Sequence, residues 1–420
     1  MKYILGALSL LVVIVFFSYI SDSNLYKNDH SNSFDVLELK LSDADLEHFY
    51  KTQQESIKNL HISPELNRWR NAKLSINKKK YKVKVRFHGT DHEHAIIQPY
   101  SFAIKLRKGE YYKGMNRFSL IMPQQEFIVD QVFFHFLDVF YNFKVHTGLY
   151  NFIVNGQPNG VTFLEEKLDK TLLEKNQMSN SDVFKTLDNW RDNKYQVAHI
   201  EPFSYIRSNI RTKSISNLSL GQTESYFKLF ELSNGKEIFN LIDKNYFAKM
   251  DAYRLLFGKA HAVAGDNLQL IYDTTSGKFS PYLRPEGTIV RLIGDNHYDL
   301  SVNAYIYNQN IKRDSASYNP LFWNLSQNEE YILIRNKYLS LILDKENEVL
   351  EYFDSIEKSY LDIASVNSSL QFQIGNNNDK VSNLSNYLNI DSLKKKSYKY
   401  KTILRSNFSH LRDYVENYPY

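Results

Sequence analysis

The chain has 420 residues and a mass of 49.4 kDa, with 43% hydrophobic and 24% charged residues. This ordinary globular composition excludes a wholly disordered chain, a collagen-like chain and a polytopic membrane protein. The net charge of +5 is a mild excess that predicts no nucleic-acid partner by itself. Cysteine is absent, which excludes disulfides, thiolate nucleophiles and zinc–thiolate sites, so a metal ion would need oxygen or imidazole ligands.

The first apolar segment runs from Tyr3 to Ile20 without a charge, which is about the length that crosses a ~30 Å hydrocarbon core as a helix. It ends in Ser21-Asp22-Ser23, a poor cleavage site for a signal peptide. We therefore predict a transmembrane signal anchor over 1–22 and a polar linker over 23–34. The main body would be extracytoplasmic, held by a single pass in the inner (cytoplasmic) membrane, or secreted if the anchor is cleaved.

The region 35–170 is predicted to be rich in strands. A short alternating run over 36–41 predicts a strand, and the acidic segment after it predicts the start of a helix. Two alternating runs over 73–88 predict a hairpin with apolar side chains on one face and basic side chains on the other. Residues 101–108 add a further strand of the same kind.

A buried helix and a second hairpin complete this region. Apolar residues are dense and helically spaced over 124–141, which predicts a largely buried helix. Two strands are predicted over 148–166, because Asn155-Gly156 supplies the chemistry of a tight turn.

The region 171–420 is predicted to be mainly helical. Helices are expected over 246–260, over 328–363 and, with many basic residues, over 391–416. A third hairpin is expected around the turn at 274–277. The basic residues of the last helix favour a solvated helix face, and contact with anionic lipid or a polyanion is the alternative.

The segment 261–273 contains the most informative group of polar residues. A predicted helix ends at His261, a short loop carries Gly265, Asp266 and Asn267, and a hairpin follows. In phosphotransferases of kinase architecture, such a loop places an Asp on the attacking hydroxyl and an Asn on a metal ion. The alternative is an ordinary turn, since Gly, Asp and Asn all favour turns.

Three features of the first half support the same chemistry. Arg86 to Asp91 form a strand-to-turn segment in which the backbone around Gly89 could face phosphates. Lys105 lies opposite its apolar neighbours and could pair with a phosphate and with Glu126 or Asp130 of the following helix. Phe163 to Glu166 close the second hairpin, where a kinase-like hinge would run. A simple turn and a solvated strand face are the alternatives for the first two.

The order of these motifs resembles the CotH kinase family, which includes the spore-coat kinase. In the first half the motifs are YKVKVRFHG, YSFAIKLRKG, KGMNRFSLI and LYNFIVNGQPNGVTFLEEKLDKTLLEKN. In the second half, MDAYRLLFGKAHAVAGDNLQLIYDTTSGKFSPYL is similar to the family's helix, His/Asp-Asn loop and Tyr-Asp…Gly-Lys hairpin. The resemblance covers about residues 80–290 and depends on several motifs in order.

The resemblance implies an α+β, two-lobed protein-kinase-like fold, with a strand-rich N-lobe and a mainly helical C-lobe after the transmembrane anchor. It implies a membrane-anchored kinase that transfers phosphate from ATP to Ser or Thr of a surface or secreted protein, with Mg²⁺ or Mn²⁺. The partner would be that protein acceptor or a surface polymer. The residues implied are Asp266 and Lys105 for catalysis, Asn267 and Glu286 for the metal, and Arg86, Gly89, Lys105 and Glu165 for the cofactor.

The chain departs from the family's pattern in two places. Where that pattern has an Asp shortly after the last hairpin, this chain has Arg284-Pro285-Glu286-Gly287. Glu286 would replace the metal-binding Asp with a longer side chain, and Arg284 would add a cation close to the metal. The end of the family's Arg-Gly-Asn-Ser loop is replaced by Gly-Thr-Asp-His at 89–92.

These departures leave a second function open. The chain would then be a catalytically degenerate protein, a pseudokinase, or a non-catalytic envelope protein involved in surface polysaccharide or coat assembly. A metal site in the histidine-rich segment His88 to His94 is a further hypothesis, with a solvated loop as its alternative.

Overall fold

The computed structural model describes most of the chain after residue 34, and all the described residues belong to one compact unit, Asp35–Tyr420. They are 35–89, 92–96, 100–121, 127–186, 206–208, 238–258, 269–285, 289, 291–292, 322, 325, 328–366 and 390–417.

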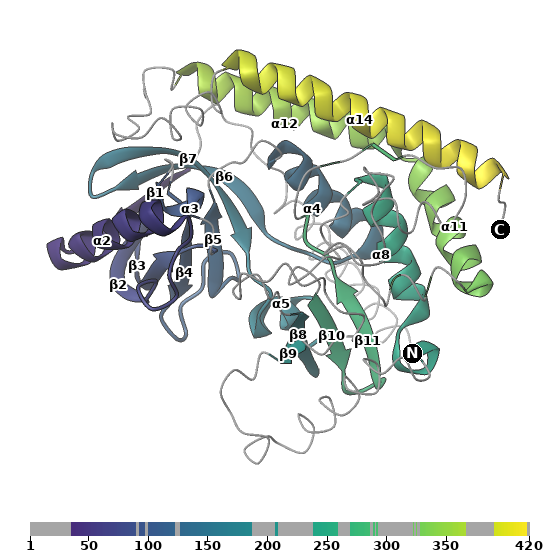
Figure 1. Cartoon of the computed structure of the whole chain (residues 1–420), viewed down its shortest axis with the longest axis horizontal. Coiled ribbons are helices and arrows are strands. Elements are labelled where there is room, and N and C mark those ends of the chain that lie inside the picture. The colour runs from purple at the N-terminus through teal and green to yellow at the C-terminus, as the bar shows by residue number, and fades with distance from the viewer. Residues whose placement is uncertain are drawn as a thin grey trace, which may run out of the picture. The chain divides into compact units, whose positions relative to one another are not determined.

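Seven strands close into a barrel in the order β1-β2-β3-β4-β5-β7-β6 (Figure 1). Neighbouring strands are antiparallel, except that β1 pairs parallel with β6 and so closes the barrel. Closure gives each of the seven strands a partner on both sides. The strands are β1 (Val36–Lys40), β2 (Arg70–Ile76), β3 (Lys79–Phe87), β4 (Phe102–Leu106), β5 (Arg117–Ile121), β6 (Thr147–Val154) and β7 (Gln157–Glu166).

The barrel interior is filled by alternate apolar residues of its strands. Leu37, Leu74, Val85, Ile104 and Leu120 are all fully buried there, whereas the residues between them face outward, as the twofold period of a strand requires. The alternation predicted over 73–88 and 101–108 is therefore confirmed.

Two helices pack on the barrel. α2 (Asp43–Asn59) begins after Ser42, whose side chain accepts a hydrogen bond from the backbone N–H of Asp45 and caps the helix. Phe49 of α2 packs edge-on against Phe87 and Phe102 of the barrel, with ring centroids 5.0 and 5.5 Å away. α3 (Glu93–Ile96) is a single turn between β3 and β4.

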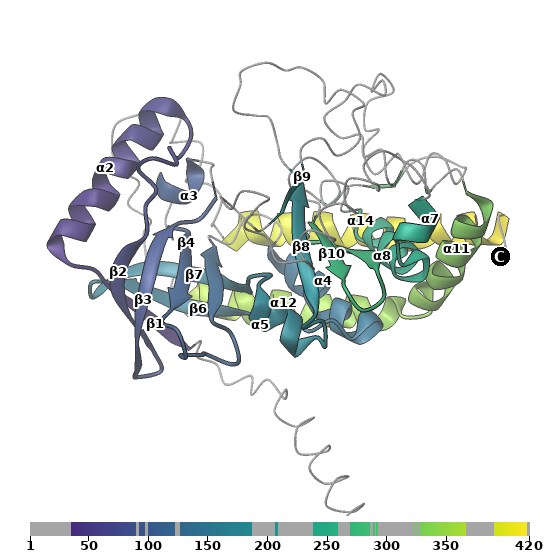
Figure 2. The same ribbon diagram turned by 90° about the horizontal axis from the view of Figure 1, so that it is seen from below.

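A second group of helices and strands forms its own core. The helices are α4 (Phe127–Tyr141), α5 (Lys170–Lys175), α7 (Ile238–Leu241), α8 (Lys244–Leu256), α11 (Glu329–Leu343), α12 (Glu346–Val366) and α14 (Ile390–Asn417). Helices α12 and α14 run side by side (Figures 1 and 2). A four-stranded sheet has the order β11-β10-β8-β9. Its strands are β8 (Ser181–Thr186), β9 (Ile206–Ser208), β10 (Gln269–Asp273) and β11 (Lys278–Tyr282).

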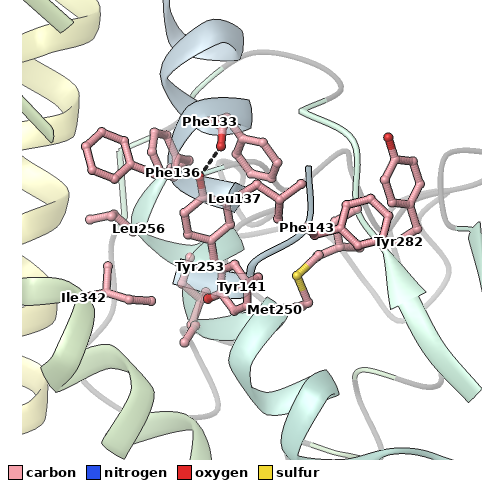
Figure 3. Close-up of a cluster of buried hydrophobic side chains, with 14 of the residues drawn as sticks. Phe133, Phe136, Leu137, Tyr141, Phe143, Met250, Tyr253, Leu256, Tyr282 and Ile342 are labelled. Carbon is pink, nitrogen blue, oxygen red and sulfur yellow. Dashed lines mark hydrogen bonds between the residues drawn. The ribbon is translucent and has the colours of Figure 1, made fainter. Parts of the chain in front are cut away.

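Aromatic rings of α4 and α8 dominate this second core. Tyr253 lies 4.6 Å from Phe133 between ring centroids, and its hydroxyl donates a hydrogen bond to the Phe133 backbone carbonyl (Figure 3). Tyr141 and Phe257 also pack edge-on against Tyr253. The buried helices predicted over 124–141 and 246–260 are thus confirmed as α4 and α8, and the terminal basic helix is confirmed as α14.

The expectation of a two-lobed kinase-like fold is wrong. The strand-rich region is a closed barrel of mixed pairing rather than an N-lobe. The later region is mostly helical among its described residues, but β8, β9, β10 and β11 build a second sheet within it. Closure occurs because Leu37 and Leu39 of β1 bury their side chains in the same core as Phe152 of β6.

The predicted transmembrane anchor gains no support from the structure. Within the ranges that the structure describes, no helix combines the length and apolar content needed to cross a bilayer. Residues 1–22 and the predicted linker 23–34 lie outside those ranges.

A buried ionic group connects three helices of the second core. Asp251 of α8 accepts hydrogen bonds from the Arg254 Nε and Nη2 atoms, at 3.1 and 2.5 Å. Arg335 of α11 places its Nη1 3.7 Å from Asp251 and donates through Nη2 to the Tyr414 hydroxyl of α14 at 2.8 Å. Both arginine side chains are fully buried, and that of Asp251 is 2% exposed.

Candidate functional site

A row of outward-facing residues, three of them polar, crosses four neighbouring strands of the barrel. Arg86 on β3, Ala103 on β4, Ser119 on β5 and Glu165 on β7 are successive partners in the ladder. Their neighbours along each strand point into the barrel, as the strand period requires. Two of the predicted cofactor-binding residues, Arg86 and Glu165, therefore share one row of the sheet.

Glu165 is a buried carboxylate held by two cations. Arg284, which follows β11, donates from Nε to Oε1 at 2.8 Å and from Nη2 to Oε2 at 2.9 Å. Lys167 places its Nζ 3.4 Å from Oε1. Burial alone would raise the pKa of Glu165, but the charges and hydrogen bonds of Arg284 and Lys167 together outweigh burial and lower the pKa to about 2. Glu165 is therefore ionised at any physiological pH.

Two further arginines flank the ring of Trp69. The guanidinium carbons of Arg86 and Arg117 lie 5.0 and 5.8 Å from the ring centroid. We call Arg86, Arg117, Lys167 and Arg284 the cation cluster. Three of its members, Lys167, Arg284 and Arg86, act electrostatically on the same histidine, His88, which places them around one point.

Two histidines, His88 and His94, lie beside the cluster. Burial, with the charge of Lys167 next, lowers the pKa of His88 well below its ordinary value. Its Nδ1 shares a hydrogen bond of 3.0 Å with the Ser119 hydroxyl, and the Nδ1 of His94 shares one of 3.0 Å with Ser101. The two imidazole rings are 5.0 Å apart. No group of three potential metal ligands occurs among the described residues, so the metal hypothesis for 88–94 finds no support there.

Gly89 fixes the turn that follows β3. Its φ is +67°, in the left-handed region that favours glycine. A Cβ at this position would come within 2.8 Å of the His94 ring. Gly89 therefore allows His94 to pack beneath the turn and beside His88.

The predicted residues fall into three groups. Arg86, Gly89 and Glu165 lie together at the outward row and its adjoining turn. Lys105 is exposed on β4, opposite Lys84 and Arg117 in the ladder, and it pairs with no carboxylate among the described residues, Asp130 included. Those outside the described ranges are Asp266, Asn267, Glu286 and the alternative lysine partner Glu126.

Four members of this site were not assigned to it from the sequence, and one of them, Arg117, was noted only within the motif KGMNRFSLI. Lys167 follows Glu165 by two residues, and that spacing could have placed it on the same side of the chain. Arg284 was expected near the metal, but its pairing with a residue 119 positions away left no sequence signal. Trp69 precedes β2 and belongs to no motif.

The arrangement is suited to binding an anion. Among the residues that the structure describes, Glu165 pairs with Arg284 and Lys167, and Asp169, at the start of α5, lies near Arg117. Guanidinium groups bind phosphate and carboxylate oxygens through paired hydrogen bonds.

No protein-family model matches the chain, and no curated protein matches it either.

Proposed function

We propose that this protein binds the phosphates of a nucleotide without transferring them, the catalytically degenerate function that the sequence leaves open. The observation that carries the proposal is the double hydrogen bond from Arg284 to Glu165, at 2.8 and 2.9 Å. Both oxygens of the carboxylate expected to face the cofactor are thereby occupied.

The gathering of cations beside Glu165 supports phosphate binding. Arg284 and Lys167 both pair with this carboxylate, and Arg86 and Arg117 flank the ring of Trp69, so a phosphate bound here would meet several guanidinium and ammonium groups. The side chains of Lys167 and Arg284 are 21% and 17% exposed, so each is partly screened from water and still reachable. Partial burial strengthens such interactions because the local dielectric constant is lower.

The position of Arg284 argues against metal-assisted transfer. The pattern of the CotH kinase family calls for a metal-binding Asp in this segment, where the chain carries Arg284 two residues before the longer acid Glu286. A fixed positive charge repels a divalent cation, and Mg²⁺ binds through carboxylates and substrate phosphates. Binding in this protein should therefore need no metal ion.

A thermal-shift titration of the full chain tests the proposal. ATP, ADP and pyrophosphate are each added at 1 mM with either MgCl2 or EDTA, and phosphoryl transfer from labelled ATP is followed in parallel. A ligand that binds only the folded state raises the melting temperature by mass action. We expect ATP to raise it by about 2 °C or more in EDTA as in MgCl2, with no transfer.

Matched variants locate the effect. Lys167→Met should abolish the shift, because it removes a cluster cation, whereas Lys337→Met, an exposed lysine of α11, should keep it. Asp266→Ala should also keep it. A shift that requires Mg²⁺, is lost in Asp266→Ala and accompanies transfer would establish a kinase instead. No shift with any of the three ligands would refute nucleotide binding.

A further inference from the structure

A second concentration of positive charge covers the outward side of strands β2, β3 and β4. We call it the basic face. All six of its cations are exposed, and none of them pairs with a carboxylate among the described residues. They are Lys73, Lys80, Lys82, Lys84, Lys105 and Arg107.

The ladder sets like charges directly opposite one another. Lys73 is the partner of Lys82, and Lys84 is the partner of Lys105. Arg107 donates its backbone N–H to the Lys82 carbonyl at 3.1 Å, which brings a third cation beside that pair. Like charges on opposed positions destabilise a sheet. The fold gains nothing from this arrangement, which favours a role in binding a ligand.

The border of the basic face shows that the repulsion is local. On the neighbouring strand β1, Lys40 is also opposite Lys73, but it forms an ion pair with Glu38 at 3.1 Å. Carboxylates thus occur next to the face and not within it.

We propose that the basic face binds a flexible, linear anionic polymer of the acidic-polysaccharide class. Outward residues repeat about every 6.7 Å along a strand and about every 4.8 Å between strands. The cations therefore form a two-dimensional grid. A polymer with a charge on each repeat can contact several of them at once, whereas a small anion can contact only one or two.

The shape and composition of the basic face favour an anionic polysaccharide over two other polyanions, a lipid bilayer and single-stranded nucleic acid. The outer surface of a closed, twisted barrel is convex, so a flat bilayer would touch few of the cations together. Proteins that bind single-stranded nucleic acid place aromatic rings among their cations to stack the bases. Asn71, Ser75 and Ala103 occupy other outward positions of the three strands, and the ring of Trp69, which precedes β2, packs with Arg86 and Arg117 of the cation cluster.

The basic face is distinct from the cation cluster. Lys105 is the ladder partner of Arg117, so the two lie side by side, but none of the six cations of the face belongs to the cation cluster. The polymer proposal therefore does not depend on nucleotide binding, and either can fail alone.

Fluorescence anisotropy tests the proposal with the full chain and labelled polygalacturonate of defined length at 50–300 mM NaCl. Uncharged dextran of the same length is the negative probe. The triple variant Lys73→Gln, Lys82→Gln, Lys84→Gln removes half of the face. Its control is Lys58→Gln, Lys337→Gln, Lys358→Gln, which removes the same charge from exposed helical positions.

We expect the face variant to bind polygalacturonate about tenfold more weakly at 50 mM NaCl. Its affinity should also depend less on the salt concentration, because a complex with fewer ionic contacts releases fewer counterions. The control should stay within about twofold. The melting temperature of the face variant should equal or exceed that of the parent, because opposed charges are removed.

Three results would overturn the proposal. An equal loss of affinity in both triple variants would show that binding depends on net charge alone and not on the basic face. Tighter binding of anionic phosphatidylglycerol vesicles or of single-stranded DNA than of polygalacturonate would assign the face to that partner. Absence of binding at 50 mM NaCl would leave the face without a polymer ligand. The ATP-induced thermal shift, measured on the same samples, reports separately on the nucleotide proposal.

Discussion

At the residue scale, Gly89 combines two constraints in one position. Its backbone is in the left-handed region, and its missing Cβ leaves room for the His94 ring. Gly109 has a similar φ of +85°, but no atom lies within 4 Å of the Cβ it lacks. Replacing each glycine by alanine therefore separates two contributions to stability: the strain of a positive φ, which both positions have, and the steric clash with His94, which only position 89 has.

Gly89→Ala should lower the free energy of unfolding by about 2 kcal/mol or more, because it adds a steric clash to an unfavourable φ. Gly109→Ala should cost only about 1 kcal/mol for the backbone alone. Urea denaturation followed by Trp fluorescence measures both. Equal losses in the two variants would show that His94 moves aside without cost.

His146 links one residue to the pH dependence of the whole fold. Burial lowers the pKa of its ring to about 3, with the charges of Lys113 and Lys175 acting in the same direction. In the unfolded chain the ring takes up a proton near its ordinary pKa of 6.5. The neutral ring therefore contributes stability that is complete above pH 6.5 and declines as the pH falls from 6.5 towards 3.

We expect His146→Gln to reduce the loss of stability between pH 7 and pH 5 by on the order of 1–2 kcal/mol. Denaturation curves at the two pH values measure the difference. His61→Gln is the matched control, because this histidine is exposed at the end of α2. An unchanged pH dependence in His146→Gln would mean that other groups cause the acid sensitivity.

Part of the site could be predicted from the sequence at this scale. Arg86, Gly89 and Glu165 were named from a turn and a hairpin end, and the ladder and the turn after β3 place them near one another. The Arg284–Glu165 pair could not be foreseen, because it depends on how the segment after β11 packs against β7. Local patterns contain no information about such long-range contacts.

At the element scale, Asp251 connects α8 to α11 and α14. One carboxylate compensates two buried guanidinium groups, those of Arg254 and Arg335. Removing the carboxylate would leave the Arg254 guanidinium in a medium of low dielectric constant without its ion-pair partner, which costs far more than the pair contributes.

Asp251→Asn should therefore lower the free energy of unfolding by about 3 kcal/mol or more. Asp413→Asn, an exposed acid of α14, should change it by less than about 0.5 kcal/mol. Chemical denaturation of both variants checks the difference. A small effect in Asp251→Asn would indicate that another group compensates the arginine charges.

Elements with a strong local pattern were predictable. The turns of the first two hairpins are confirmed with Asn77 and Asn155, both at a φ of +49°, which asparagine tolerates better than most residues. The apolar spacing of 124–141 predicted α4 because nearly every inward position carries a large apolar side chain.

At the scale of the whole molecule, β6 and β7 belong to two cores at once. Leu164 faces the barrel interior, and its neighbour Phe163 faces the core of α4 and α8. The alternation of a single strand thus connects the two cores. Sequence patterns predicted both strands, but not that their two faces would be covered by different cores.

Because these strands are shared, we expect damage to one core to weaken both. Leu120→Ala, deep in the barrel, should cost about 3 kcal/mol and increase amide hydrogen exchange in α4 and α8 as well as in the barrel. Leu339→Ala in the second core is the reciprocal control and should expose the barrel equally. Faster exchange confined to the mutated half would show that the cores unfold independently.

The parallel pairing of β1 with β6 has a consequence for the nascent chain. Val36 pairs with Asn151, so the first strand to leave the ribosome has to wait for about 115 further residues before its second neighbour exists. Until then the growing sheet presents a hydrogen-bonding edge on β1, of the kind that other strands readily join. Such long-range closure is slow compared with forming a hairpin. The interval before residue 154 has been synthesised is therefore the period in which this protein is most prone to associate with another copy of itself or to need a chaperone.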